Sequence, residues 1–209
     1  MSRDPVPLYW ADACRALSKA DPVMARLIET HTASALQSRG DAFTTLARAI
    51  VGQQISVKAA AAIWERVRRV AQPFNAHTLL ACDLTDFAGL GLSARKIDYL
   101  QDLSRHFVQT PNLESILESL PDDAVVVRLT EIRGVGSWTA EMFLLFGLMR
   151  PDILPVKDLG LLKAISLHYQ AGQPVNAQQA AQIALPWRPW RSVATWFLWR
   201  SLDPIPVDY

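Results

Sequence analysis

The sequence predicts an all-α protein, and three observations lead to that fold class. Apolar side chains recur at spacings of three and four residues through nearly the whole chain, which is the repeat of one helix face. Ser, Asn and Asp, the residues that cap helix N-termini, stand just before several of these segments. Only Ala124-Val125-Val126-Val127 has a strand-like composition, and it is too isolated to pair with a second strand. With 209 residues and 50% hydrophobic content, the chain can bury a full core as one compact unit or as two small lobes.

The helical segments of the first part of the chain follow one another with short breaks. The earliest has one apolar stripe, made by Phe43, Leu46, Ala47, Ile50 and Val51. Each of the next four begins at a residue suited to a helix start, and these residues are Ser56, Ser93, Asn112 and Asp122. This part of the chain is therefore predicted to be helical from end to end.

The most apolar segment is Trp138–Met149, which is hydrophobic on every face and is therefore predicted to be a buried central helix. The stretch from Pro151 to Pro155 breaks the helical pattern and is the predicted crossing between two lobes. Later helices are expected to begin near Asp158, Asn176 and Pro189, the proline being suited to a first-turn position.

Cysteine content, apolar runs and charge bear on whether the protein is disulfide-bonded, membrane-spanning, secreted or nucleic-acid-binding. Cys14 and Cys82 have no nearby histidines, which favours reduced thiols in a cytosolic protein over a disulfide or a metal site. No apolar run approaches the roughly 18 residues of a membrane span, and residues 1–5 lack the charged-then-apolar plan of a secretory signal. The net charge of +1 gives only weak support for a nucleic-acid partner, because duplex affinity usually depends on Lys and Arg. A local basic patch would still allow DNA binding.

Two glycines, Gly134 and Gly136, interrupt two helical patterns. Glycine permits a positive φ and close backbone approach, so the turn around Val135 can present backbone amides to an anion. Ser137 is suited to cap the next helix, whose positive end would point at the same anion. Three apolar residues are placed to pin this turn to a core, and they are Leu129, Ile132 and Val135. The pattern predicts a hairpin between two helices that holds a phosphate.

This hairpin, followed further along by the lone carboxylate of Asp158, resembles the motif of the helix-hairpin-helix DNA glycosylases. The run Trp187–Trp199 is similar to the C-terminal segment of the AlkA-like 3-methyladenine DNA glycosylases (type II) in that superfamily. The resemblance implies a two-lobed all-α fold with the active site in the cleft between the lobes. Residues 42–150 would form the lobe with the hairpin, and residues 1–41 with 151–209 the lobe with the catalytic aspartate. Two cysteines are too few for the iron–sulfur cluster of some relatives.

The resemblance makes Asp158 the catalytic carboxylate, and its sequence context also suits a helix N-cap. A helix N-terminus favours the charged form of a carboxylate. Cleavage of an N-glycosidic bond builds positive charge on the sugar, which a fixed anion stabilises. Glycoside hydrolases use a second carboxyl as general acid, but an alkylated purine already carries positive charge and leaves without that help. A single aspartate therefore suits the removal of 3-methyladenine and 7-methylguanine.

The resemblance also places a base pocket and predicts the absence of a lyase step. Superfamily members that cut the backbone carry a lysine nucleophile two residues past the second hairpin glycine, where this chain has Trp138. Trp138 and Trp199 are the expected pocket walls, because an indole face attracts a cationic base. Met142 and Leu159 occupy positions that are aromatic in some relatives, so the pocket is expected to be less aromatic.

Several groups of residues are expected to contact double-stranded DNA. At the hairpin these are Gly134, Val135, Gly136, Ser137 and Thr139. A second group follows Gly52, where Gln53, Gln54 and Ser56 interrupt two helices. In AlkA-like relatives a side chain from this loop fills the gap left by the extruded nucleotide, and the resemblance gives that position to Gln54. Arg95 and Lys96 would bring charge to the DNA backbone. Relatives often hold a monovalent cation on hairpin carbonyls, which here would be those of Thr130, Ile132 and Val135.

The sequence thus predicts a monofunctional DNA glycosylase of base excision repair that acts as a monomer on duplex DNA containing a damaged base. Apart from this monovalent cation, no cofactor, metal or membrane partner is expected, and a bacterial source would place the protein in the cytoplasm with the nucleoid. Two alternatives stay open. One is uracil or thymine-mismatch specificity on the same scaffold, and the other is a non-catalytic helix-hairpin-helix module that only binds DNA. Asp158 weighs against the second, since a binding module needs only the hairpin.

Overall fold

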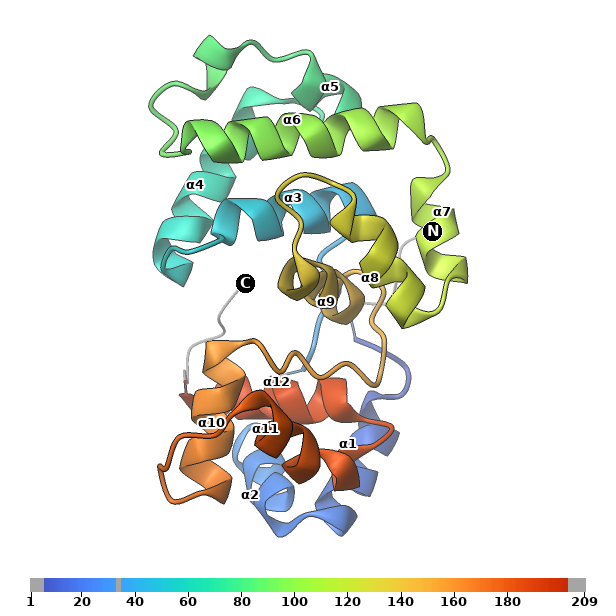
Figure 1. The fold of residues 1–209 in the computed structure, drawn as a ribbon, viewed down its shortest axis with the longest axis vertical. Coiled ribbons are helices and arrows are strands. Elements are labelled where there is room, and N and C mark those ends of the chain that lie inside the picture. The colour runs from blue at the N-terminus through green and yellow to red at the C-terminus, as the bar shows by residue number, and fades with distance from the viewer. Residues whose placement is uncertain (1–5, 33–34, 203–209) are drawn as a thin grey trace. The chain divides into compact units, whose positions relative to one another are not determined.

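The computed structural model describes residues 6–32 and 35–202, and all regular structure within these ranges is helical (Figure 1). This confirms the all-α prediction. The strand-like run at residues 124–127 lies inside a helix. The helices group into two compact units. The middle unit comprises Arg39–Leu148, and the terminal unit combines the described residues up to Ser38 with those from Met149 onward.

The middle unit is built around two buried helices. Its elements are α3 (Ala42–Gly52), α4 (Val57–Val70), α5 (Ala76–Leu80), the 3-10 helix η1 (Leu84–Phe87), α6 (Ala94–Gln109), α7 (Leu113–Ser119), α8 (Asp122–Thr130) and α9 (Ser137–Phe146). Helix α3 packs against α4, α6 and α9. Its predicted stripe is buried, with Leu46, Ala47, Ile50 and Val51 fully inside. Helix α9 is buried from Thr139 to Phe146 apart from Glu141, which explains why it is apolar on every face.

Capping residues begin helices largely where the sequence predicts. The Ser56 hydroxyl caps α4 and the Ser93 hydroxyl caps α6, each accepting a backbone N–H three residues on. Two boundaries of the middle unit outside the hairpin differ from expectation. Pro121 occupies the N-cap position of α8, so Asp122 is its first residue. Helix α9 ends at Phe146 rather than continuing to Met149, whose φ of 54° is incompatible with a right-handed helix.

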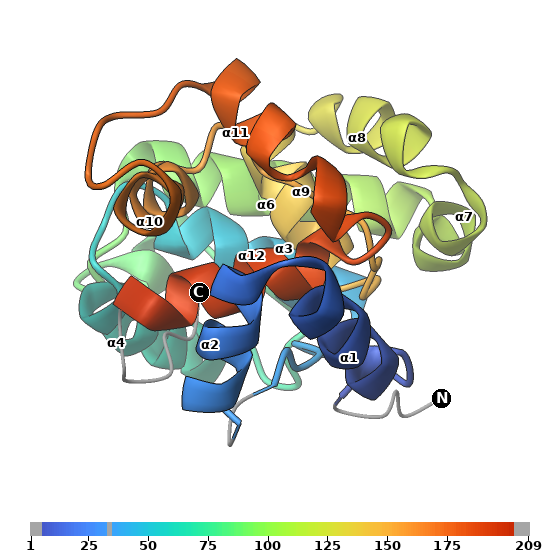
Figure 2. The same ribbon diagram turned by 90° about the horizontal axis from the view of Figure 1, so that it is seen from below.

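The terminal unit packs its helices around α12. Its elements are α1 (Trp10–Ala20), α2 (Pro22–Thr30), α10 (Leu159–Tyr169), α11 (Ala177–Ile183), the 3-10 helix η2 (Leu185–Trp187) and α12 (Arg191–Leu202). Helix α12 contacts α1, α2 and α10 (Figure 2), and every residue from Ser192 to Arg200 is buried. Asn176 caps α11 as expected. Pro189 lies just before α12 instead of in its first turn, and its peptide bond with Arg188 is cis.

A buried carboxylate, Asp21, ties the first helices of the terminal unit to the tryptophan-rich segment. Its Oδ1 caps α2 by accepting the Val23 and Met24 amides. Its Oδ2 accepts the Trp187 indole N–H and the Tyr169 hydroxyl, both at 2.8 Å. Burial, and then the hydrogen bond to Asp21, raise the pKa of Tyr169. Trp187 is thus part of the core.

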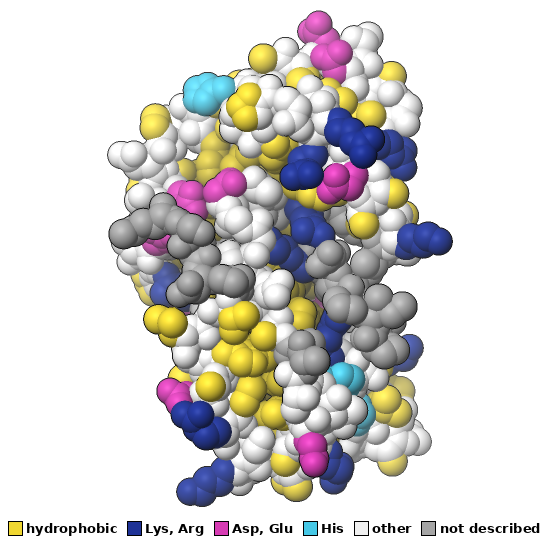
Figure 3. All heavy atoms as spheres, turned by 180° about the vertical axis from the view of Figure 1, so that it is seen from behind, with side chains coloured by type: hydrophobic (Ala, Val, Ile, Leu, Met, Phe, Trp, Pro, Cys, Tyr) yellow, Lys and Arg dark blue, Asp and Glu magenta, His cyan; other side chains and the backbone are white. Residues whose placement is uncertain are grey.

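One face of the molecule carries charges of both signs. On the face shown in Figure 3, Lys and Arg side chains are scattered, with Asp and Glu side chains among them. None of the helices in the described residues has both the length and the apolar character needed to cross a membrane.

Candidate active site

The predicted hairpin lies in the middle unit, between the end of α8 and the start of α9 (Figure 1). Gly134 has a φ of +85°, and a Cβ atom there would lie 2.2 Å from the Tyr99 ring, so only glycine fits. Gly136 differs: its φ of −90° and ψ of 176° are open to any residue, and a Cβ there would meet nothing within 4 Å. Gly136 also occupies the N-cap position of α9, which makes Ser137 the first helical residue rather than the expected cap.

Three buried residues hold the hairpin in place, as the sequence predicts. Leu129, Ile132 and Val135 are buried, while Gly136 is exposed. The Val135 amide donates to the Ile132 carbonyl inside the turn at 3.1 Å, so this amide stabilises the hairpin. A further anchor was not foreseen: the buried carboxylate of Asp102 on α6 accepts the Arg133 amide at 2.9 Å.

The segment after α3 is tied to the hairpin by a glutamine. The Gln53 side-chain amide donates to the Gly134 carbonyl at 2.8 Å and to the Thr139 hydroxyl at 3.1 Å. Thr139 is buried, so both residues make internal contacts. Gln54 is exposed and has a φ of +58°, a conformation that non-glycine residues seldom adopt. Ser56 then caps α4.

Arg95 and Lys96 are adjacent in the first turn of α6 but differ in their surroundings. Arg95 is exposed. The Lys96 ammonium donates to the Val51 and Gln53 carbonyls at the end of α3, both at 2.7 Å. Its side chain is half-buried, and this burial lowers the pKa of Lys96. The structure therefore places the Lys96 charge on the C-terminus of α3, which the sequence did not indicate.

Asp158 lies in the terminal unit as the N-cap of α10, as predicted from its context. Its Oδ1 accepts the Leu161 amide at 2.7 Å and the Trp199 indole N–H at 2.9 Å. Trp199 is only 4% exposed. Gly160 leaves room for this contact, because a Cβ there would lie 3.1 Å from Oδ1 and 3.6 Å from the indole ring. Leu159, beside the aspartate, is 81% exposed.

The irregular segment before Asp158 is fastened to the start of α12. The Ser192 hydroxyl donates to the Arg150 carbonyl at 2.6 Å and accepts the Ile153 amide at 2.9 Å. The Arg191 guanidinium binds both carboxylate oxygens of Asp152, at 2.6 and 2.9 Å. Because α12 also carries Trp199, the same helix positions the aspartate from two directions.

The predicted pocket residues are distributed over both units. Trp138 is half-buried and Met142 is buried, both on α9 of the middle unit. Leu159 and Trp199 belong to the terminal unit. A base pocket formed by all four side chains stays a prediction. The Trp199 contact adds a second role that the sequence did not indicate, because its N–H points at the aspartate.

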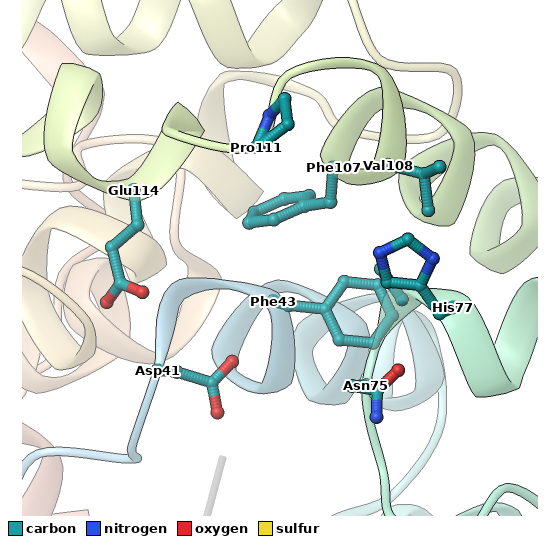
Figure 4. A pocket seen from close by; sticks show the side chains of 9 residues that line it. Asp41, Phe43, Asn75, His77, Phe107, Val108, Pro111 and Glu114 are labelled. Carbon is teal, nitrogen blue, oxygen red and sulfur yellow. The ribbon is translucent and has the colours of Figure 1, made fainter.

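A hollow in the middle unit is lined by other residues. Phe43 and Phe107 form apolar walls, and Asp41, Asn75 and Glu114 line its rim (Figure 4). Asp41 caps α3, Asn75 caps α5, and Glu114 accepts the Ala42 amide at 3.2 Å. These polar groups therefore stabilise helix starts. None of the predicted site residues lines this hollow. The described residues also contain no group of three or more His, Cys, Asp or Glu side chains placed to hold a metal ion.

A family model described as the HhH-GPD superfamily of base excision DNA repair proteins matches residues 47–189. The chain belongs to this family. The matched range includes the hairpin, the Gln53–Gln54 segment, Lys96 and Asp158, while Trp199 lies beyond it.

Individual HhH-GPD relatives are similar over most of the chain. The Schizosaccharomyces pombe 3-methyladenine DNA glycosylase Mag1, solved in complex with abasic DNA, has a TM-score of 0.81 and 27% identity, covering 91% of this chain and 96% of that one. A DNA-3-methyladenine glycosidase from Bacillus halodurans has a TM-score of 0.75 and 30% identity, with coverages of 93% and 90%. The YfjP protein of Bacillus subtilis (strain 168) is 28% identical over 188 residues; the match covers 86% of this chain and 66% of YfjP.

Proposed function

We propose that this protein is a monofunctional DNA glycosylase that removes alkylated purines, such as 3-methyladenine and 7-methylguanine, from duplex DNA in base excision repair. Membership of the HhH-GPD family and the names of the relatives support the reaction class. The observation that carries the proposal is the fixed carboxylate of Asp158, whose Oδ1 is held by the Leu161 amide and the Trp199 indole.

The proposed reaction needs an oriented anion. When the N-glycosidic bond breaks, its electron pair goes to the base and positive charge develops on the sugar. Asp158 would stabilise this charge, and water then adds to the sugar carbon and loses a proton to the surrounding solvent. An alkylated purine is neutralised by the electron pair it takes, so no second carboxyl is required as general acid. Two donors on one carboxylate oxygen keep the anion in one orientation before the reaction begins.

The hairpin is the proposed grip on the DNA backbone. The fold requires glycine at Gly134 but not at Gly136, where both the backbone angles and the space would accept a side chain. Gly136 is exposed and stands at the positive end of α9. A glycine that the fold does not need, at a helix N-terminus, fits close approach by a phosphate from outside.

Gln54 is the proposed gap-filling residue. It is exposed, and its positive φ sets it apart from the neighbouring helical residues. Strained backbone of this kind is often found at functional positions. Its amide would occupy the place of the extruded nucleotide and hydrogen-bond the orphaned base.

The hairpin carbonyls also suit the monovalent cation that the resemblance implies. Thr130 ends α8, so its carbonyl is among those that a helix leaves without an intrahelical partner. The Ile132 carbonyl accepts one N–H and keeps a second lone pair. Together with Val135 these neutral oxygens fit a hard cation. The cation would supply positive charge beside the phosphate.

Base release from defined duplexes tests the proposal. Substrates contain 3-methyladenine, 7-methylguanine, hypoxanthine, ethenoadenine or uracil, and enzyme is in excess. We expect efficient release of the two cationic bases and markedly slower release of hypoxanthine and uracil. Faster excision of uracil than of 3-methyladenine would instead favour uracil or mismatch specificity. Tight binding to an abasic-site duplex without release of any base would indicate a binding module.

A further inference from the structure

A short hydrogen-bonded network in the middle unit joins three segments that are far apart in the sequence. It begins at Lys96 on α6, whose ammonium donates to the carbonyls of Val51 and Gln53. Carbonyls in the last turn of a helix lack intrahelical partners and lie at the negative end of its dipole. Lys96 therefore caps the C-terminus of α3 from a neighbouring helix. Its half-buried position draws the charge away from solvent.

The network continues through the Gln53 side chain to the hairpin. Its amide nitrogen carries two hydrogens, and it donates to the Gly134 carbonyl and to the Thr139 hydroxyl. Gly134 is the hairpin residue that the fold restricts to glycine, and Thr139 is in the first turn of α9. The Gln53 backbone carbonyl thus accepts a hydrogen bond from Lys96, and the Gln53 side chain donates to the hairpin.

Gln54 is the next residue, so the network fixes the point from which it projects. On its other side, Ser56 is fixed as the cap of α4. The strained φ of Gln54 is therefore held between two anchored residues, Gln53 and Ser56. A side chain that must enter a duplex gap while the hairpin holds a phosphate benefits from a fixed distance between the two.

We propose that Lys96 and Gln53 are positioning residues. They hold the Gln54 segment (residues 52–56) and the hairpin (residues 132–139) together as one rigid element that contacts DNA. This inference rests on the proposed function for the part that concerns catalysis. In this proposal the Lys96 ammonium binds the Val51 and Gln53 carbonyls of the protein itself. The adjacent Arg95, which is exposed, is then the residue available for phosphate contact.

The test compares Lys96→Met with Arg95→Met as a matched neighbour. Single-turnover excision of 3-methyladenine should fall about tenfold or more in Lys96→Met, because displacement of a substrate-positioning group by an ångström can cost that much. Binding to an abasic-site duplex is measured at several salt concentrations, and the slope of log affinity against log salt concentration is compared. The magnitude of this slope should stay at the wild-type value in Lys96→Met and fall by about one in Arg95→Met. Lys96→Arg, which keeps a cationic N–H donor at this position, should recover most of the rate.

Amide hydrogen exchange of the free protein tests the coupling without any DNA. Lys96→Met should raise exchange about tenfold both at residues 52–56 and at hairpin residues 132–139, since loss of a hydrogen bond opens the structure by roughly that factor. Faster exchange at residues 52–56 alone would overturn the proposal. It would also be overturned by a salt slope reduced by one with unchanged exchange, which is the signature of a phosphate contact.

Gln53→Met is the second variant, and it keeps the test decisive if Lys96→Met folds poorly. It removes both bonds to the hairpin while the backbone carbonyl that binds Lys96 remains. It should slow excision and loosen the hairpin in the same way. Wild-type protein that releases no base would refute the proposed function, while the exchange data would still decide whether the two segments are coupled.

Discussion

The indole N–H of Trp199 is expected to contribute to catalysis through Asp158, and Trp199→Phe isolates this contribution. Phenylalanine keeps an aromatic face but removes the donor that lies 2.9 Å from Oδ1. A hydrogen bond to a charged group is worth about 1.5–3 kcal/mol, which corresponds to roughly a 10- to 150-fold change in rate if the whole of it serves the transition state. The Leu161 amide still holds the same oxygen at 2.7 Å, so we expect the lower end, about tenfold.

Single-turnover release of 3-methyladenine and 7-methylguanine at saturating enzyme measures this effect. A loss of orientation at Asp158 slows both bases by the same factor. A pocket wall behaves differently, because phenylalanine preserves much of the cation–π attraction and should leave the rates nearly unchanged. Trp199→Ala then removes the wall as well and should affect cationic bases more than neutral ones.

Trp187→Phe is the matched control for this substitution. Trp187 is a buried tryptophan of the same unit whose N–H also binds an aspartate, Asp21, at 2.8 Å. Its replacement should lower the melting temperature without changing the single-turnover rate. Equal slowing by Trp187→Phe and Trp199→Phe would refute the reasoning, as would a Trp199→Phe rate within twofold of wild type.

Three further outcomes follow from the proposed site. Asp158→Asn should reduce base excision about a hundredfold or more while binding to an abasic-site duplex stays within a few-fold, and near-wild-type excision would remove the catalytic assignment. Gly136→Ala should leave thermal stability unchanged and weaken duplex binding, whereas Gly134→Ala should destabilise the fold because its Cβ would overlap Tyr99. Calorimetry measures the stability and titrations measure the binding. Strong destabilisation by Gly136→Ala would contradict the geometry. Borohydride treatment during turnover should trap no covalent protein–DNA adduct, since Trp138 stands where a Schiff-base lysine would be, and a stable adduct would show a lyase step.

Much of the fold could be predicted because each helix start depends on residues within a few positions of it in the sequence. Ser56, Ser93, Asp158 and Asn176 all cap helices through side-chain bonds to amides three residues further on. The same logic would have found α2, where Asp21 caps a helix that begins with proline. Its start signal was present but lay outside the segments with the clearest apolar stripes.

The contacts that orient the site could not be predicted in this way. Trp199 and Asp158 are 41 residues apart, Lys96 and Gln53 are 43 apart, and Gln53 and Gly134 are 81 apart. Each of these hydrogen bonds depends on how helices pack and on the side-chain conformations that the packing allows. A local sequence pattern therefore cannot predict it. Gly134 and Gly136 make the same point: they look equivalent in the sequence, and only the backbone angles and the Tyr99 ring separate them.

The modest net charge is consistent with DNA binding once the positions of the cations are known. Several basic side chains are occupied within the protein: Arg191 binds Asp152, Arg105 binds Asp102, and Lys96 caps α3. These cations are engaged inside the protein, whereas Arg95 is exposed. Backbone amides at the start of α9 are dipoles, so the phosphate contact proposed for them would not add to the net charge. An enzyme that held DNA in this way would need a precisely placed hairpin more than a basic surface, and the anchors of the hairpin and of the Gln54 segment would then matter as much as the charges themselves.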